Sequence, residues 1–205
     1  KTHLWIVDER RVPFDDDRCN FRAIEETIGE HSGIPTEQVH PMHAMAEDAD
    51  LAYQRELRDY LAWREKGHDR LDFVLLGMGS DGHTASLFPR SPALMADLDP
   101  DPKEAELPVH ERPSLVRFNR GPTVTPPDRL TLTLPMINAS RFIAVMVTGE
   151  GKRPMLERVS RSISGDTPAA PAELPILGVQ PLAGEMRWYM DHAAAPGTTS
   201  NGAAA

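Results

Sequence analysis

The chain has 205 residues, of which 40% are hydrophobic and 26% are charged, and its formal net charge is −9. These proportions are ordinary for a globular protein and allow one substantial core. An acidic chain without clustered Lys and Arg fits a phosphate backbone poorly, so we expect no nucleic-acid partner. No apolar run reaches the length of about 18 residues that a membrane helix needs. The single cysteine, Cys19, excludes an internal disulfide.

Strand-like and helix-like segments alternate along most of the chain. Four apolar runs are typical of strands buried on both faces of a sheet. They occupy residues 4–7, 73–76, 130–134 and 142–147. Helical periodicity predicts helices at residues 20–29 and 49–66, and a third from Glu150 to about Ser160. The alternation predicts an α/β fold, with a Rossmann-like open, mostly parallel sheet and helices on both of its faces.

Two Pro-rich stretches, at residues 91–127 and 166–175, interrupt this pattern. Only residues 115–118 of the first resemble a strand, and after the second we expect two short closing strands at 176–179 and 186–190. The small-residue tail 193–205 predicts disorder, which leaves residues 1–192 as a single domain. Because the chain opens on an apolar run without an initiator Met, we expect it to be a piece of a longer protein.

The densest chemical signal lies between Leu75 and Pro89, where three glycines, an Asp and a His follow a buried strand. Ligands of open α/β sheets bind beyond the carboxyl ends of the strands. An imidazole at that place can take up a proton near neutral pH, so His83 is the candidate general base. Asp81 is placed either to orient that imidazole or to cap the turn.

Other interpretations of this segment fit less well. The glycine spacing matches a dinucleotide-binding loop, but Pro89 and Pro92 interrupt the helix that such a loop requires. Ser80 and Ser86 lack the G-x-S-x-G frame of a serine hydrolase. A glycine turn with an incidental His stays open as a third interpretation. The residues alone therefore indicate a site that handles a phosphate or a carbonyl group, without fixing the reaction.

A second pair of histidines, His40 and His43, precedes several carboxylates. Metal binding needs a third convergent ligand, and Pro41 indicates a loop in place of a preformed face. We expect no metal site there or elsewhere in the chain.

Residues 77–89, G-M-G-S-D-G-H-T-A-S-L-F-P, resemble the signature block of the 6-phosphogluconolactonase family. Three further blocks agree in order: V-D-E-R at 7–10 with the Asn20 that follows, R-L-T-L-T-L-P at 129–135, and V-T-G-E-G-K at 147–152. The likeness covers roughly residues 3–192. Family members carry a further N-terminal αβ segment with a phosphate loop, and we expect this chain to lack it.

The resemblance implies a role for each candidate residue. His83 would activate the water that attacks the lactone carbonyl, Asp81 would orient its imidazole, and amides from Gly79 to Gly82 would stabilise the oxyanion. The implied substrate-binding residues are Arg10, Lys152, Asn20, Gly79, Gly82 and Arg129. Each also has a plain structural alternative: a solvated charge for Arg10, an exposed helix side chain for Lys152, a helix cap for Asn20 and a carboxylate partner for Arg129.

The function implied by the resemblance is hydrolysis of 6-phospho-D-glucono-1,5-lactone in the oxidative pentose phosphate pathway. No cofactor, metal or membrane partner is implied, and the expected location is cytoplasmic. One alternative is an aminosugar-phosphate isomerase or deaminase, whose similar turn continues into a carboxylate that residues 84–89 lack. Others are a sugar-phosphate-binding protein without turnover, and a lactonase fused to a sugar-phosphate dehydrogenase in the endoplasmic reticulum lumen.

Overall fold

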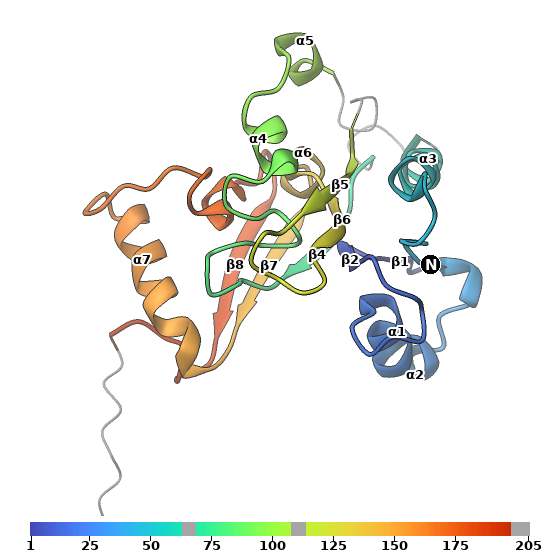
Figure 1. Ribbon diagram of the computed structural model, residues 1–205, viewed down its shortest axis with the longest axis horizontal. Coiled ribbons are helices and arrows are strands. Elements are labelled where there is room, and N and C mark those ends of the chain that lie inside the picture. Colours follow the sequence, from blue (N-terminus) through green and yellow to red (C-terminus); the bar gives the residue numbers. More distant parts are fainter. Residues whose placement is uncertain (63–68, 108–113, 198–205) are drawn as a thin grey trace, which may run out of the picture.

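The fold contains two parallel sheets, and the larger one, with β4, β7 and β8, lies near its centre (Figure 1). The computed structural model describes residues 1–62, 69–107 and 114–197. β4 (Phe73–Leu76), β7 (Phe142–Val147) and β8 (Glu185–Met190) pair in that order as parallel strands. A shorter parallel pair joins β1 (Leu4–Trp5) to β3 (Val39–His40). Parallel strands connected through helices confirm the predicted α/β class.

A third sheet is antiparallel, which the sequence does not predict. It contains β2 (Asp8–Arg10), β6 (Asp128–Leu132) and β5 (Val116–Arg120), with β6 in the middle. The apolar run at 130–134 therefore does not join the parallel sheet, and its strand ends at Leu132. A helix, α6 (Leu134–Asn138), begins there because Pro135 has no N–H for a ladder but suits the first turn of a helix.

Helices fill the connections between the strands. The helix predicted at 20–29 is confirmed as an α-helix continued by a π-helix, and the one predicted from Glu150 begins with a 3₁₀ turn. The helix predicted at 49–66 is confirmed as far as Ala62, and residues 63–66 lie outside the described part. The remaining bounds are as follows: α1 (Asn20–Ile24), η1 (Glu25–Gly29), α2 (Glu30–Ser32), η2 (Thr36–Gln38), α3 (Ala49–Ala62), α4 (Pro92–Leu98), α5 (Pro102–Ala105), η4 (Glu150–Lys152) and α7 (Arg153–Ile163).

The strand predicted at 176–179 is wrong. This stretch forms a 3₁₀ helix, η5 (Pro175–Gly178). Its amide groups turn away from any sheet, because the Ile176 N–H donates to the Gly82 carbonyl at 3.0 Å and the Val179 N–H donates back to Ile176. The apolar side chains that suggest a strand are buried against the core instead. The turn thereby packs against the glycine-rich segment that follows β4. The second closing strand, predicted at 186–190, is confirmed as β8.

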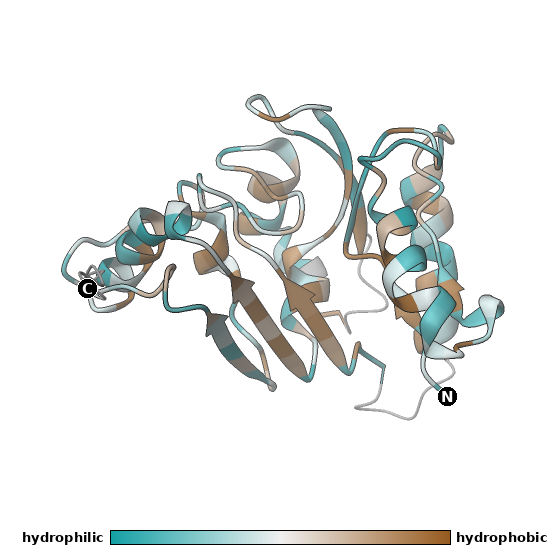
Figure 2. Cartoon of the chain, turned by 90° about the horizontal axis from the view of Figure 1, so that it is seen from below, coloured by the Kyte–Doolittle hydropathy of each residue, from teal (hydrophilic) through white to brown (hydrophobic). Residues whose placement is uncertain are grey.

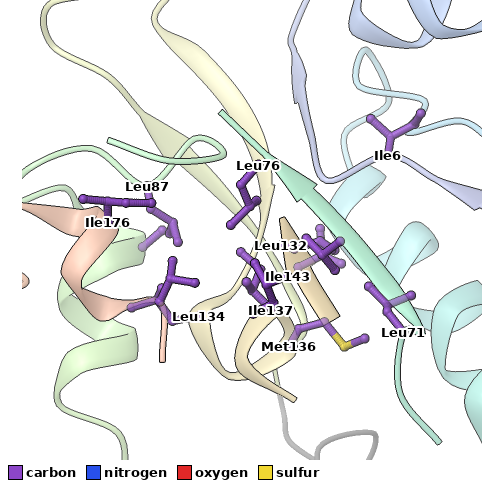
Figure 3. Close-up of a cluster of buried hydrophobic side chains, with 14 of the residues drawn as sticks. Ile6, Leu71, Leu76, Leu87, Leu132, Leu134, Met136, Ile137, Ile143 and Ile176 are labelled. Carbon is purple, nitrogen blue, oxygen red and sulfur yellow. The ribbon is translucent and has the colours of Figure 1, made fainter. Parts of the chain in front are cut away.

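One continuous hydrophobic core joins the sheets and helices of the described residues. Figure 3 shows Leu76, Leu132, Ile137 and Ile143 meeting between the parallel and antiparallel sheets. Each of these side chains is at most 2% exposed. Burying one such side chain is worth about 1.5–3 kcal/mol relative to leaving it in water. Burial of Leu76 therefore anchors β4 at the point where the strand enters the glycine-rich turn.

The opposite face of the parallel sheet is open. Along β4 the side chains alternate, with Val74 and Leu76 buried while Phe73 is 57% and Leu75 49% exposed. Met146 on β7 lies on the same face and is 50% exposed. Figure 2 shows these strands as apolar ribbons along an uncovered side. Within the described residues, helices thus cover this sheet on one face and not on the other.

The start of the tail is ordered, unlike the prediction for 193–205. Ala194 is fully buried and its N–H donates to Asp191 Oδ1 at 2.8 Å. The guanidinium of Arg153, at the start of α7, donates twice to the Ala193 carbonyl. These bonds anchor residues that composition alone marks as loose. Residues 198–205 lie outside the described part.

Candidate functional site

The turn after β4 places a His–Asp pair at the carboxyl end of the parallel sheet. His83 Nδ1 lies 2.5 Å from Asp81 Oδ1, and the His83 amide also donates to that oxygen at 3.1 Å. A carboxylate only accepts hydrogen bonds, so Nδ1 is the nitrogen that donates to Asp81, and in a neutral imidazole Nε2 is then the acceptor. Burial raises the pKa of the Asp81 carboxyl, but the hydrogen bonds from His83 outweigh it and leave the pKa below its ordinary value. Asp81 therefore stays ionised and orients the imidazole.

Two glycines make this arrangement possible. A Cβ on Gly79 would lie 2.1 Å from His83 Nδ1 and 2.7 Å from Asp81 Oδ1, so any side chain there would displace the pair. Gly82 has a φ of +82°, and a Cβ on it would lie 2.1 Å from Leu174. The amides of both glycines are already used, because Gly79 N donates to the His83 carbonyl and Gly82 N to the Gly79 carbonyl. These two amides do not fit the predicted oxyanion role. The Asp81 amide donates to its own carboxylate, which leaves the Ser80 amide as the backbone candidate.

The antiparallel sheet contributes the cationic side of the site. In its register Asp8 lies opposite Thr131, and Arg10 lies opposite Arg129. Residues two apart on a strand share a face, so these four side chains lie on one face of the sheet. Two guanidinium groups directly opposite each other repel, which destabilises a strand pair unless an anion lies between them. The register is thus typical of an anion-binding surface.

Arg129 is the most constrained of these cations. The residue is 5% exposed, and its Nη1 has no hydrogen-bond partner within the described part of the chain. Burial lowers the pKa of its guanidinium, the charge of Arg10 lowers it further, and attraction to Asp8 and Glu9 compensates only in part. A buried guanidinium nitrogen without a partner is costly, and a bound phosphate or carboxylate would supply the missing acceptor.

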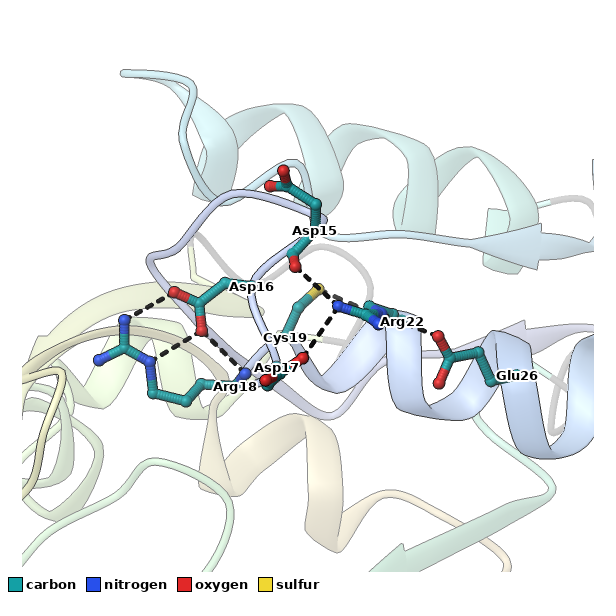
Figure 4. Close-up of polar contacts among 7 residues, drawn as sticks. All are labelled: Asp15, Asp16, Asp17, Arg18, Cys19, Arg22 and Glu26. Carbon is teal, nitrogen blue, oxygen red and sulfur yellow. Dashed lines mark hydrogen bonds and ion pairs between the residues drawn. The ribbon is translucent and has the colours of Figure 1, made fainter.

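The loop between β2 and α1 fixes Arg10 and Asn20. Arg10 donates through Nη1 to the Arg18 carbonyl at 2.7 Å. Figure 4 shows how the loop itself is held: Arg18 forms a two-pronged pair with Asp16, and Arg22 bonds to the Asp15 carbonyl, Asp17 and Glu26. The pair with Arg18 holds the pKa of the Asp16 carboxyl far below its usual range. An otherwise exposed loop is thereby shaped around the site.

A buried carboxylate supports the first turn of α1 beneath this loop. Glu9 is 1% exposed and accepts the backbone N–H groups of Asn20 and Phe21, each at 2.7 Å. Negative charge at the start of a helix is favourable. Asn20 donates its side-chain amide to the Asp8 carbonyl at 2.7 Å. Asn20 does not cap α1, because the accepting cap atom is the sulfur of Cys19.

Lys152 reaches the site from a different part of the chain. It lies in η4, after β7, and its Nζ donates to the Met78 carbonyl at 2.8 Å. Met78 belongs to the turn that carries His83, and Lys152 and His83 line the same pocket. One carbonyl occupies only one of the three ammonium donors. The predicted alternative, an exposed helix lysine, does not describe this contact.

These groups line one pocket of about 400 Å³. Six of the predicted site residues lie on its surface: His83, Gly79, Arg10, Asn20, Arg129 and Lys152. The other two do not line the pocket: Asp81 contacts the His83 ring, and Gly82 lies against Leu174. Asp8, Ser86 and Phe88 also line the pocket, and they were not among the predicted site residues. Asp8 could have been found from its place two residues before Arg10 on a strand.

The His40 side chain is 2% exposed and contributes to a different cluster. Its Nδ1 lies 2.6 Å from Glu56, its Nε2 lies 2.9 Å from His3, and its ring stacks on Trp5. His43 does not take part in these contacts. Among the described residues no group of three or more His, Cys, Asp or Glu side chains has a geometry that could hold a metal ion. No helix of the described residues is long and apolar enough to cross a membrane.

Comparison with known proteins shows which family the chain belongs to. Residues 1–188 match the model of glucosamine-6-phosphate isomerases/6-phosphogluconolactonase. The chain belongs to this family. It is 35% identical over 202 residues to the 6-phosphogluconolactonase of Mycobacterium tuberculosis, covering 95% of this chain and 72% of that protein. The solved 6-phosphogluconolactonase of Thermotoga maritima is 29% identical, with a TM-score of 0.67 over 92% of this chain and 72% of that one.

Other relatives are considerably longer than this chain. A GDH/6PGL endoplasmic bifunctional protein of Homo sapiens is 38% identical over 199 residues, which are 93% of this chain and 22% of that protein. A probable chloroplastic 6-phosphogluconolactonase of Oryza sativa is 31% identical, and the match covers 56% of its length. The chain therefore spans between about a fifth and about three quarters of the relatives that it resembles.

Proposed function

We propose that the protein hydrolyses 6-phospho-D-glucono-1,5-lactone to 6-phosphogluconate. The observation that carries this proposal is one pocket lined by an oriented imidazole and by three cations, Arg10, Arg129 and Lys152. A phosphorylated lactone has a matching pair of features, an electrophilic carbonyl and a dianionic phosphate. The relatives named 6-phosphogluconolactonase, from Mycobacterium tuberculosis and Thermotoga maritima, support the choice of substrate.

His83 is the general base in this mechanism. Its Nε2 takes a proton from a water molecule as the water oxygen bonds to the lactone carbonyl carbon. The tetrahedral oxyanion collapses, the bond from that carbon to the ring oxygen breaks, and the ring oxygen receives the proton back from His83. Asp81 stabilises the imidazolium that exists between the two proton transfers. The products are the free acid, which ionises, and the open-chain hydroxyl.

The cations hold the phosphate away from the reacting carbon. Arg129 and Arg10 offer guanidinium groups on one sheet face, and Lys152 offers an ammonium next to the His83 turn. Bonds from guanidinium to phosphate are charge-assisted and can be two-pronged, which fixes orientation as well as affinity. Asn20 lines the same pocket, where its side chain is placed for a sugar hydroxyl.

The test is lactone hydrolysis by the purified chain. The substrate is generated in place from glucose 6-phosphate, and the spontaneous rate is subtracted. We expect saturable hydrolysis above that rate, and no ammonia release from glucosamine 6-phosphate, since residues 84–89 supply no carboxylate after the turn. Ammonia release would favour the isomerase branch of the family. Stabilisation by 6-phosphogluconate without hydrolysis would favour a binding protein.

The location and the fusion partner follow from the same relatives. We propose a cytoplasmic enzyme, supported by the free-standing 6-phosphogluconolactonase of Mycobacterium tuberculosis. The alternative is the lactonase part of a fusion with a sugar-phosphate dehydrogenase, supported by the bifunctional GDH/6PGL endoplasmic proteins of Homo sapiens and Oryctolagus cuniculus. Immunoblotting of fractionated cells distinguishes the two, because the fusion would migrate as a much larger polypeptide in the membrane-enclosed fraction.

A further inference from the structure

Ser86 is hydrogen-bonded to all three strands of the antiparallel sheet. Its hydroxyl donates to Asp8 Oδ2 on β2 at 2.6 Å, and its amide donates to Thr131 Oγ1 on β6 at 3.2 Å. Its carbonyl accepts from Asn119 Nδ2 on β5 at 2.7 Å. Ser86 is 1% exposed, and it lines the pocket three residues after His83. It joins the His83 side of the pocket to the cationic side.

The residue before it supports the view that this junction is functional. Ala85 has a φ of 49°, in the left-handed region that residues other than glycine seldom adopt. Such a conformation persists only when its surroundings fix it, and it is enriched at functional sites. The three bonds at Ser86 supply that fixation immediately downstream.

The bond from Ser86 to Asp8 also decides where a negative charge lies. Asp8 shares a sheet face with Arg10 and Arg129, and its charge acts on Arg129. A carboxylate so near two guanidinium groups would normally pair with one of them. Here one Asp8 oxygen accepts the Ser86 hydroxyl instead, while Arg129 Nη1 keeps no partner within the described residues.

We propose that Ser86 is a positioning residue for substrate binding. Its hydroxyl holds the Asp8 carboxylate away from Arg129, so that the guanidinium stays open for the anion of the substrate. The identity of that anion as a phosphate ester rests on the proposed function. The role of Ser86 itself rests on the contacts of Asp8 and Arg129. Loss of the hydroxyl frees Asp8 to pair with Arg129, and this ion pair then competes with the substrate anion for the guanidinium.

A double-mutant cycle tests the proposal. Binding of inorganic phosphate and of 6-phosphogluconate is measured by calorimetry for the unaltered chain, Ser86→Ala, Asp8→Asn and the double variant. We expect Ser86→Ala to weaken phosphate binding about tenfold, the size of one charge-assisted contact. In the Asp8→Asn background the same change should cost less than about twofold, because an amide cannot neutralise Arg129. An equal loss in both backgrounds overturns the proposal.

A matched control and a kinetic readout separate positioning from general damage. Ser91→Ala removes another buried hydroxyl of the same loop, one that bonds to Asn119 and does not line the pocket. It should leave phosphate binding unchanged. In turnover, Ser86→Ala should raise KM for the lactone while kcat and its pH profile stay within about twofold, since His83 is untouched.

The remaining outcomes of these experiments also support or overturn the proposed role of Ser86. If Ser86→Ala does not fold, Asp8→Asn alone carries the test: it should bind phosphate at least as tightly as the unaltered chain, and a tenfold loss overturns the proposal. Absence of phosphate binding by the unaltered chain overturns it as well. Phosphate binding with the expected coupling, but without lactone turnover, refutes the proposed function and leaves the role of Ser86 intact.

Discussion

The imidazole of His83 depends on a neighbour only two residues away. In the proposed mechanism Asp81 holds the proton on Nδ1, so that Nε2 can accept one from water. Gly79 leaves room for the pair by having no side chain. A turn of five residues thus contains the proposed base, the carboxylate that orients it and the space for both. The contact between His83 and Asp81 could be predicted from sequence alone, because the two residues are only two apart.

The first prediction separates the base from the residue that orients it. His83→Ala should lower kcat by about 10²- to 10⁴-fold, the usual contribution of a general base. Asp81→Asn keeps the shape but removes the charge that stabilises the imidazolium, and should lower kcat with little change in KM. Both are measured as lactone hydrolysis above the spontaneous rate. Circular dichroism is the control for folding, and full turnover in folded His83→Ala would disprove the mechanism.

The second prediction concerns the buried guanidinium of Arg129. Replacing a buried charge that has an unpartnered nitrogen by an apolar side chain of similar length relieves its burial cost, so Arg129→Met should stabilise the free protein by about 1–3 kcal/mol. It should also abolish the stabilisation that inorganic phosphate gives to the unaltered chain. Urea unfolding with and without phosphate measures both effects. A variant that is less stable yet still gains from phosphate would show that Arg129 has a structural role instead.

At the scale of elements, the buried carboxylate of Asp97 connects α4 to the strand β5 and to the helix α6. Asp97 lies in α4, its side chain is 1% exposed, and it accepts the Leu134 N–H at the start of α6 at 2.8 Å. Its other oxygen pairs with Arg117 on β5 at 3.2 Å. Burial raises the pKa of Asp97 to about 6, against the opposing effects of these two partners. Protonation of this carboxyl is therefore easier in the folded state than in the unfolded chain.

The third prediction follows from the sign of that shift. Because the folded pKa lies above the unfolded value of 3.8, the folded state binds more protons between the two, and the contribution of Asp97 to stability falls as pH rises from about 4 to about 6. Asp97→Asn cannot titrate and should escape this loss, which amounts to roughly 2–3 kcal/mol. Urea unfolding of both proteins at pH 4 and pH 7.5 gives the difference. A gap that does not widen with pH would contradict the prediction.

Elements whose pattern is local were predicted well, and those that depend on distant partners were not. β4 and β7 were found because their apolar runs are continuous, and β8 was found as a short closing strand after the second Pro-rich stretch. The antiparallel pairing of Arg10 with Arg129 joins residues far apart in the chain, and no local pattern announces it. The same holds for the bond between Ser86 and Asp8, which spans 78 residues. η5 was mistaken for a strand because buried apolar side chains look alike in both conformations.

At the scale of the whole molecule, the open face of the parallel sheet stands out. Sheets of parallel strands are ordinarily covered on both faces, yet Phe73, Leu75 and Met146 are each about half exposed here. Contiguous apolar surface of this kind promotes association in solution. The net charge of −9 opposes it by mutual repulsion, and salt weakens that repulsion. Self-association of the chain should therefore increase with ionic strength.

The fourth prediction uses two neighbouring leucines of β4 as a matched pair. Leu76 is 2% exposed, so Leu76→Ala should cost about 2–5 kcal/mol of unfolding free energy through the cavity it leaves. Leu75 points to the open face, so Leu75→Ala should cost under about 1 kcal/mol and should reduce association at high salt. Urea unfolding and sedimentation velocity at two salt concentrations measure the two effects. Equal costs at both positions would mean that the open face is covered in solution, because a side chain that already contacts another surface loses those contacts when it is shortened.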